Sequence, residues 1–219
     1  MNRRALAAEA VGTAGLVAVV VGSGIMGWNL SNGNAAIALL ANALATGCGL
    51  FVLISIFAPV SGAHFNPLVS ILALANGTLS TTECMDRVVV QIGAAIAGTW
   101  LAHAMFDLQV FEVGVQQRSG AAQWLSETTA TMGLVLTIGA ARHKSTEAAA
   151  ATVGAYIAAA YWFSASTSFA NPAVTIARAM TTTFSGIALA DAPMFVLAQC
   201  LGALLGHVLC RYFWPPKPM

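Results

Sequence analysis

Two similar stretches determine the predicted fold. The first is Ser61-Gly62-Ala63-His64-Phe65-Asn66-Pro67-Leu68-Val69-Ser70, and the second is Ser168-Phe169-Ala170-Asn171-Pro172-Ala173-Val174-Thr175. Each predicts a helix that begins inside apolar sequence, because Asn is a favoured N-cap and Pro is well tolerated at the first helical position. The first helix is expected to end at Asn76-Gly77 and the second near Met180. A helix of about 10 residues rises roughly 15 Å, half the thickness of a hydrocarbon core. Two such half-helices therefore span a membrane if their N-termini meet at its centre.

The composition indicates a membrane protein. Of the 219 residues, 58% are hydrophobic and only 8% are charged, whereas soluble domains carry about 25% charged residues. The net charge of +1 gives no indication of a nucleic-acid partner. The apolar run after Arg3 and Arg4 lacks a clear cleavage site, so we interpret it as the first membrane helix rather than a signal peptide. The length suits one membrane domain, residues 1–219.

Six long apolar segments predict membrane-spanning helices, and the second of them is expected to end before Pro59. Abundant Gly and Ala suit close helix crossings in lipid. The predicted fold is therefore all-α, with six transmembrane helices and two half-helices that meet at the midplane. The six segments are residues 6–28, 35–57, 88–106, 122–141, 148–163 and 193–214.

Two halves of the chain, roughly residues 1–106 and 121–214, repeat the same markers in the same order. Each half holds three spans, which is an odd number, so the second half must be inverted relative to the first. Inverted repeats place functional sites near the midplane, between broken helices. The repeated markers are Glu9 and Glu127, Gln91 and Gln199, and the Asn-Pro pairs, which lie 171 − 66 = 105 residues apart.

Basic residues orient the bundle, because Lys and Arg are enriched on the cytoplasmic side of membrane proteins. If six spans cross, only Arg118 and Arg178 fall on the far side. We therefore expect a multi-pass protein of a bacterial inner membrane with both termini in the cytoplasm. The residues on the cytoplasmic side are Arg3, Arg4, Arg87, Arg142, Lys144, Arg211 and Lys217.

Nearly the whole chain resembles the aquaporin, or major intrinsic protein, family. The resemblance implies a channel in a homotetramer, in which each subunit carries its own pore for water and small neutral solutes across a lipid bilayer. Leu68 departs from the family's usual Ala and is expected to alter the shape of the central constriction without removing a donor. The resemblance rests on Ser61–Leu68, on Asn171, Pro172 and Ala173, and on the pairs Glu9/Glu127 and Gln91/Gln199.

The paired motifs Asn66-Pro67-Leu68 and Asn171-Pro172-Ala173 are the predicted centre of the pore. Each Asn offers amide N–H groups to a solute oxygen while its cap fixes the backbone. Two positive helix ends at one place repel protons and cations, as in aquaporin-type channels. The alternative is that both Asn residues serve only as helix caps.

Two intramembrane carboxylates, Glu9 and Glu127, are candidate functional residues by their position. The resemblance implies that they support the loops that lead into the half-helices; the alternative is a proton relay in a transporter. No Lys, Arg or His pairs with either acid at a recognisable spacing. His64 either lines the cytoplasmic vestibule or is a packed side chain.

The chain lacks the spacing of a metal site or of a nucleophile with its base, so we expect no metal, no cofactor and no enzyme activity. Its cysteines are interpreted as free, packed thiols, with a pore-facing Cys48 as the alternative. The cysteines are Cys48, Cys84, Cys200 and Cys210.

The outer selectivity filter is where the chain departs most from the family pattern. Val174 stands where water- and glycerol-conducting relatives usually carry Arg, and counting back from the Asn residues places Thr46, Ala159 and Ser168 in the same ring. Because these side chains are small or modest in size and uncharged, the ring is expected to be wide, neutral and partly apolar, which favours glycerol and other polyols, urea and arsenous acid, together with water. It resembles the filter of aquaporins that accompany bacterial arsenic-resistance genes.

Arg178 follows Val174 by four residues and so lies on the same helix face. It either supplies positive potential further out or pairs with a loop carboxylate such as Asp191. Three rival functions remain: a water-selective aquaporin, an ion-coupled transporter, which would need paired intramembrane charges, and a junction protein, which would need larger loops.

Overall fold

Eight α-helices form the described part of the chain, residues 2–141 and 144–215, in this computed structural model. The order of two long helices, one short helix and one long helix occurs twice. Arg142 and Lys217, two of the basic residues used for orientation, lie outside the described residues. The helices are α1 (Arg3–Leu30), α2 (Ala35–Ser61), α3 (Pro67–Ala75), α4 (Thr81–Met105), α5 (Ala121–Ala141), α6 (Thr146–Phe163), α7 (Pro172–Arg178) and α8 (Ala192–Phe213).

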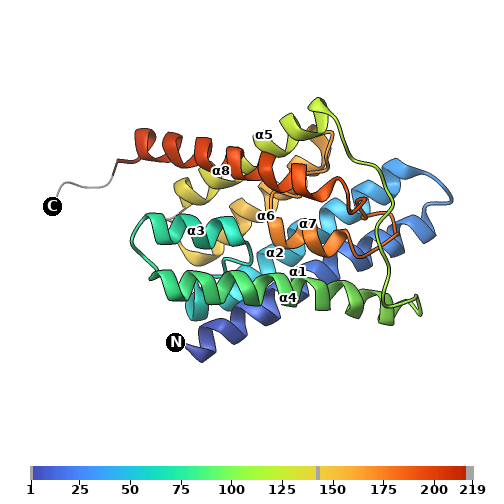
Figure 1. Cartoon of the computed structure of the whole chain (residues 1–219), viewed down its shortest axis with the longest axis horizontal. Coiled ribbons are helices and arrows are strands. Elements are labelled where there is room, and N and C mark those ends of the chain that lie inside the picture. The colour runs from blue at the N-terminus through green and yellow to red at the C-terminus, as the bar shows by residue number, and fades with distance from the viewer. Residues whose placement is uncertain (1, 142–143, 216–219) are drawn as a thin grey trace.

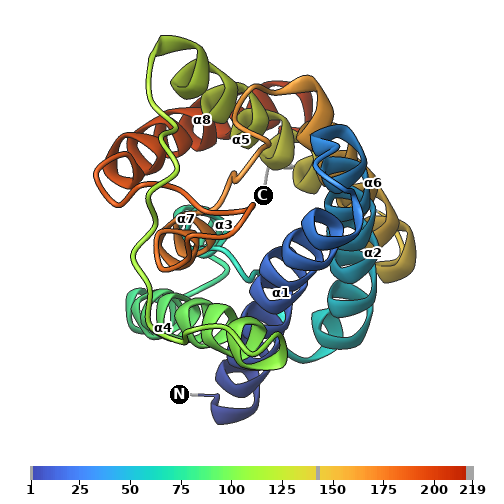
Figure 2. The same cartoon turned by 90° about the vertical axis from the view of Figure 1, so that its right-hand side faces the viewer.

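The two short helices lie end to end in the middle of the bundle. Figure 1 shows α3 and α7 as consecutive pieces of one interrupted rod, and the end view in Figure 2 superimposes them. Helix α1 begins, and α8 ends, at the same end of the bundle (Figure 1). Each short helix thus runs from one end of the bundle to its centre, which places the two Asn-Pro pairs together.

Lengths and composition suit a bilayer. Within the described residues, α1, α2, α4 and α8 are long and apolar enough to cross a membrane. The shortest long helix, α6, has 18 residues and rises about 27 Å. Large apolar side chains such as Val89, Leu125 and Leu204 are exposed on the outer surface, where lipid tails would cover them.

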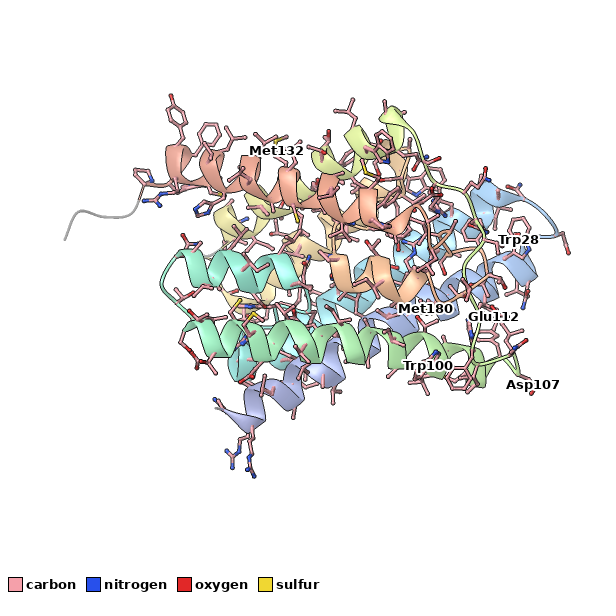
Figure 3. All side chains as sticks on the ribbon, in the orientation of Figure 1. Trp28, Trp100, Asp107, Glu112, Met132 and Met180 are labelled. Atoms are coloured by element: carbon pink, nitrogen blue, oxygen red, sulfur yellow. The ribbon has the colours of Figure 1, made fainter. Side chains whose placement is uncertain are left out.

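Tryptophans mark the end of the bundle opposite the chain termini. Trp28 and Trp100 lie there together with the loop acids Asp107 and Glu112 (Figure 3). Trp28 stacks on Phe184 at 5.4 Å between ring centroids. Aromatic residues at this level are typical of a membrane–water interface, where a ring contacts both lipid and headgroups.

Glycines allow the helices to cross closely. A Cβ atom on Gly47 of α2 would lie 2.8 Å from the carbonyl oxygen of Gly154 on α6. Gly98 of α4 faces the carbonyl of Ala14, and Gly202 of α8 faces that of Thr128, with no room for a side chain. Because lipid supplies no hydrophobic drive between helices, this close backbone contact is what holds the long helices together.

Two predicted helix boundaries are wrong for identifiable reasons. Helix α2 does not stop before Pro59 but continues to Ser61 and ends at Gly62, whose φ of +87° closes the helix. A proline in the last turn removes a single hydrogen bond, which membrane helices tolerate. Helix α4 begins at Thr81 rather than near residue 88, because Ser80 and Glu83 form a capping box ahead of the apolar segment.

Candidate pore and outer filter

Asn66 and Asn171 cap the two short helices and face each other. The Oδ1 atom of Asn66 accepts from the backbone N–H of Leu68 at 3.0 Å, and that of Asn171 accepts from Ala173 at 3.0 Å. Pro follows each Asn at the first helical position, where its missing N–H costs nothing. The predicted helix starts are therefore confirmed, although α7 ends at Arg178, short of Met180.

The asparagine side chains also join the two halves of the chain. Asn66 Nδ2 donates to the carbonyl oxygen of Ala170 at 2.8 Å, and Asn171 Nδ2 donates to that of Phe65 at 2.7 Å. An amide nitrogen carries two N–H groups, so each Asn has used one for this crossed contact. Both side chains line the central cavity, which leaves the second N–H of each available to a solute.

A cavity of about 340 Å³ runs beside the asparagines. Its lining on α6 extends from Thr146 to Tyr161, a separation of 15 residues or about 22 Å along the helix. Apolar side chains make up much of the lining, and polar residues lie beside the half-helices, at the end of α6 and also at its start, where Lys144 and Thr146 line the cavity. The apolar lining includes Leu16, Val20, Leu50, Leu134, Ile138, Val153 and Ile157; the polar lining includes Thr46, His64, Asn66, Ser168 and Asn171.

Glu9 holds the loop in front of α3. Its carboxylate is fully buried and accepts from Ser61 Oγ, from the backbone N–H groups of His64 and Phe65, and from Gln91 Nε2. The loop needs this support because Phe65 adopts a left-handed φ of 49°, which is strained for a bulky side chain.

Glu127 makes the same set of contacts in the second half. It accepts from Ser166 Oγ, from the backbone N–H groups of Phe169 and Ala170, and from Gln199 Nε2. The loop residues involved are those of the first half shifted by 105 positions, the spacing of the Asn-Pro pairs. Ala170 repeats the left-handed φ of the first loop, at 48°. The two carboxylates thus hold the loops that carry the asparagines.

Arg87 is a partner of Glu9 that sequence reasoning missed. Its Nη1 lies 3.4 Å from Glu9 Oε1 and also donates to the carbonyl oxygen of Ser61. The expectation of no basic partner is therefore wrong for Glu9. The two residues are 78 positions apart, so no local spacing reveals the pair. Arg87 contacts one carboxylate oxygen of Glu9, and neutral donors bind both oxygens, so the carboxylate is fixed in one position.

Three of the four predicted filter residues line the cavity: Thr46, Ser168 and Val174. Ala159 does not; it lies exposed on the outer face of α6, so that assignment is wrong. Counting back from Asn171 fails because the loop between α6 and α7 sets which face of α6 reaches the pore. Tyr161 takes the place instead, with its hydroxyl 3.2 Å from Thr46 Oγ1.

Of the other residues discussed in the sequence analysis, one lines the cavity and two do not. His64 lines the cavity, with Nδ1 3.0 Å from Ser70 Oγ. Leu68 does not shape the constriction as expected, since it is buried with Val135 and Ala203 between α3, α5 and α8. Cys48 is exposed on the outer surface and does not contribute to the cavity lining.

Comparison with known families gives a match to the major intrinsic protein family over residues 1–168 and 140–217. The chain is 52% identical to aquaglyceroporin AqpS of Rhizobium meliloti (strain 1021) over 216 residues, which is 99% of this chain and 92% of that protein. The chain belongs to the major intrinsic protein family. A second member, aquaporin TIP1-1 of Arabidopsis thaliana, is 33% identical over 141 residues, covering 62% of this chain and 55% of that protein.

A solved structure of another major intrinsic protein has the same fold. The X-ray structure of the aquaglyceroporin from Plasmodium falciparum superimposes with a TM-score of 0.76 and 18% identity, over 97% of this chain and 96% of that one. At this identity the match shows the fold alone. The all-α aquaporin fold expected from the sequence is thereby confirmed, as is the family resemblance. The major intrinsic proteins are membrane channels, so this chain is an integral membrane channel.

Proposed function

We propose that this channel passes small neutral solutes, namely glycerol and other polyols, urea and arsenous acid, together with water, down their gradients. The observation that carries the proposal is Val174 at the outer end of the cavity, where Thr46 and Ser168 complete a lining without a carboxylate. These side chains offer hydroxyl groups to a solute and carry no charge themselves. The name of the relative AqpS, an aquaglyceroporin, supports the same class of solute.

The central asparagines supply the donors in this proposal. Each amide has one N–H fixed against the opposite loop, and both residues line the cavity, so the second N–H of each is the donor that we assign to a solute oxygen. Apolar side chains on α5 and α6 form the other wall, which suits the carbon face of a polyol. The order of contacts, with donors on one side and apolar groups on the other, fits glycerol better than an ion.

Water-selective conduction is the second candidate, and one observation favours it. Tyr161 places an aromatic ring beside Thr46 at the outer end, which narrows the opening more than the predicted Ala159 would. Solute size separates the candidates, because glycerol needs a wider opening than water.

Stopped-flow light scattering on proteoliposomes tests the proposal. Water, glycerol, urea and arsenous acid gradients are imposed on the same preparation, with protein-free liposomes as the control. We expect glycerol and arsenous acid permeability at least about tenfold above the control, which corresponds to about 1.4 kcal/mol of barrier. Raised water permeability with glycerol permeability at the control level would establish the water-selective alternative instead.

The setting in the cell follows from the same proposal. We place both termini in the cytoplasm, the loop carrying Asp107 and Glu112 outside, and the channel in a bacterial inner membrane as a homotetramer with one pore per subunit. The basic residues Arg3, Arg4 and Arg211 near the helix ends on the terminal side support this orientation.

A further inference from the structure

Arg178 is a buried cation beside the pore. It is the last residue of α7, its side chain is 1% exposed, and it lines the cavity together with Val174. The four-residue separation from Val174 corresponds to about 6 Å along the helix, one turn nearer the outer end. A buried charge without a partner is costly in a protein interior, so the groups that surround the guanidinium decide whether it is stable there.

Of the two alternatives that the sequence leaves for Arg178, the pairing with Asp191 is wrong. Asp191 accepts instead from the backbone N–H of Arg118 at 2.7 Å. In the described residues, the one salt bridge joins Arg87 to Glu9, and Arg178 has none. Tyr161, Arg118 and Glu127 are the titratable groups near enough to interact electrostatically with Arg178. Each oxygen of Glu127 already accepts two hydrogen bonds from other groups.

Two contacts hold the Arg178 side chain in one orientation. Its Nε donates to the carbonyl oxygen of Ser185, and its guanidinium carbon lies 3.4 Å from the ring centroid of Phe169. Phe169 lines the cavity and is itself fixed, by the Glu127 hydrogen bond to its backbone and by edge-to-face packing on Phe195. A guanidinium stacked on an aromatic face keeps its charge and its remaining donors.

Arg178 keeps a donor that no residue uses. Its Nη1 is buried without a hydrogen-bond partner among the described residues. Arg118, on the same phenylalanine at 5.4 Å, is different: it donates to Gly186, Ser166 and Gln116 and does not line the cavity. Of these two arginines, Arg178 is therefore the one that lines the cavity and keeps an unpaired donor.

We propose that Arg178 is the cationic residue of the outer filter, set one helical turn beyond Val174, and that it rejects cations while Val174 leaves the ring wide for neutral solutes. The proposal rests on the proposed function as a neutral-solute channel. A fixed positive charge in a narrow, low-dielectric passage raises the barrier for a cation far more than for an uncharged solute.

Replacing the charge tests the proposal directly. Sodium leak into dye-loaded proteoliposomes at an inside-negative potential is compared for wild type, Arg178→Gln and Arg178→Lys, with Arg211→Gln as a control far from the filter. We expect Arg178→Gln to leak at least about tenfold faster, whereas Arg178→Lys and Arg211→Gln stay near wild type. Arg178→Gln should change glycerol flux far less than sodium leak, because an uncharged solute does not meet the charge barrier that a cation meets.

Chemical restoration of the charge provides a second test that does not depend on the glutamine variant folding. Arg178→Cys is treated with a methanethiosulfonate that attaches an ethylammonium group, or with one that attaches a neutral methyl group. The treated wild type controls for the native cysteines. The ammonium reagent should return the leak of Arg178→Cys to the wild-type level, and the neutral reagent should leave it high.

The outcomes separate the two proposals. If folded Arg178→Gln leaks sodium no faster than wild type, the assignment of Arg178 as the cation barrier is overturned. The same holds if both reagents change the sodium leak of Arg178→Cys equally. If wild-type protein passes no glycerol, the proposed function fails, while the sodium comparison still decides whether Arg178 excludes cations.

Discussion

Replacing Glu127 with Gln is expected to destabilise the channel severely. The carboxylate is fully buried, and its two oxygens accept from Ser166, Phe169, Ala170 and Gln199. A glutamine turns one oxygen into an NH₂ group that faces existing donors, which leaves two buried donors unpaired. Each unpaired group costs about 1–3 kcal/mol, and no water in the hydrocarbon region relieves it. We expect a loss of at least about 2 kcal/mol and a displaced Asn171.

Thermal melting in detergent, followed by tryptophan fluorescence and size exclusion, measures this effect. Glu147→Gln is the matched control, since Glu147 is an exposed acid in the first turn of α6 and should cost about 1 kcal/mol or less. A Glu127→Gln protein that melts like wild type but no longer transports would contradict the structural role. It would favour the proton-relay alternative instead.

Replacing Val174 with Arg is expected to close the ring to polyols. The new side chain would enter the outer end of the cavity beside Thr46 and Ser168. It would also place a second guanidinium about one turn from Arg178, so the two like charges repel. We expect glycerol and arsenous acid flux to fall at least about tenfold, with water flux falling less, in stopped-flow measurements on matched amounts of folded protein.

Val174→Leu separates size from charge in the same assay. Leucine adds one methylene group without a donor or a charge, so glycerol flux should fall about two- to threefold and sodium leak should not change. If Val174→Arg reduces water and glycerol flux by one common factor, Val174 does not set the size limit. Its assignment to the filter would then be withdrawn.

Local chemistry explains why the centre of the pore could be predicted. An Asn-Pro pair determines a helix start from neighbouring residues alone, so Asn66 and Asn171 were placed without knowledge of the tertiary structure. The sequence shows that Glu9 is repeated as Glu127. The structural role of the two acids follows only from the tertiary structure, in which loop N–H groups donate hydrogen bonds to both carboxylates.

Contacts between distant segments explain what could not be predicted. Counting along the chain predicts Ala159 in the filter, but the path of the loop before Asn171 turns Tyr161 to the cavity instead. The place of Leu68 in the motif predicts a role in the constriction, yet the rotation of α3 buries it away from the cavity. The stacking of Arg178 on Phe169 could not be predicted either. It depends on a loop that adopts left-handed backbone angles at residues other than glycine, so the sequence gives no local indication of the turn.

Conduction through this channel is passive, so the steady-state level of glycerol in proteoliposomes should equal the level outside. Labelled glycerol uptake is followed to completion with no gradient, with an imposed pH gradient, and with an imposed membrane potential. A channel brings the internal concentration to the external one and no further, with the same end point in all three conditions. Accumulation above the external concentration that a protonophore abolishes would contradict the account and make Glu9 or Glu127 a coupling group.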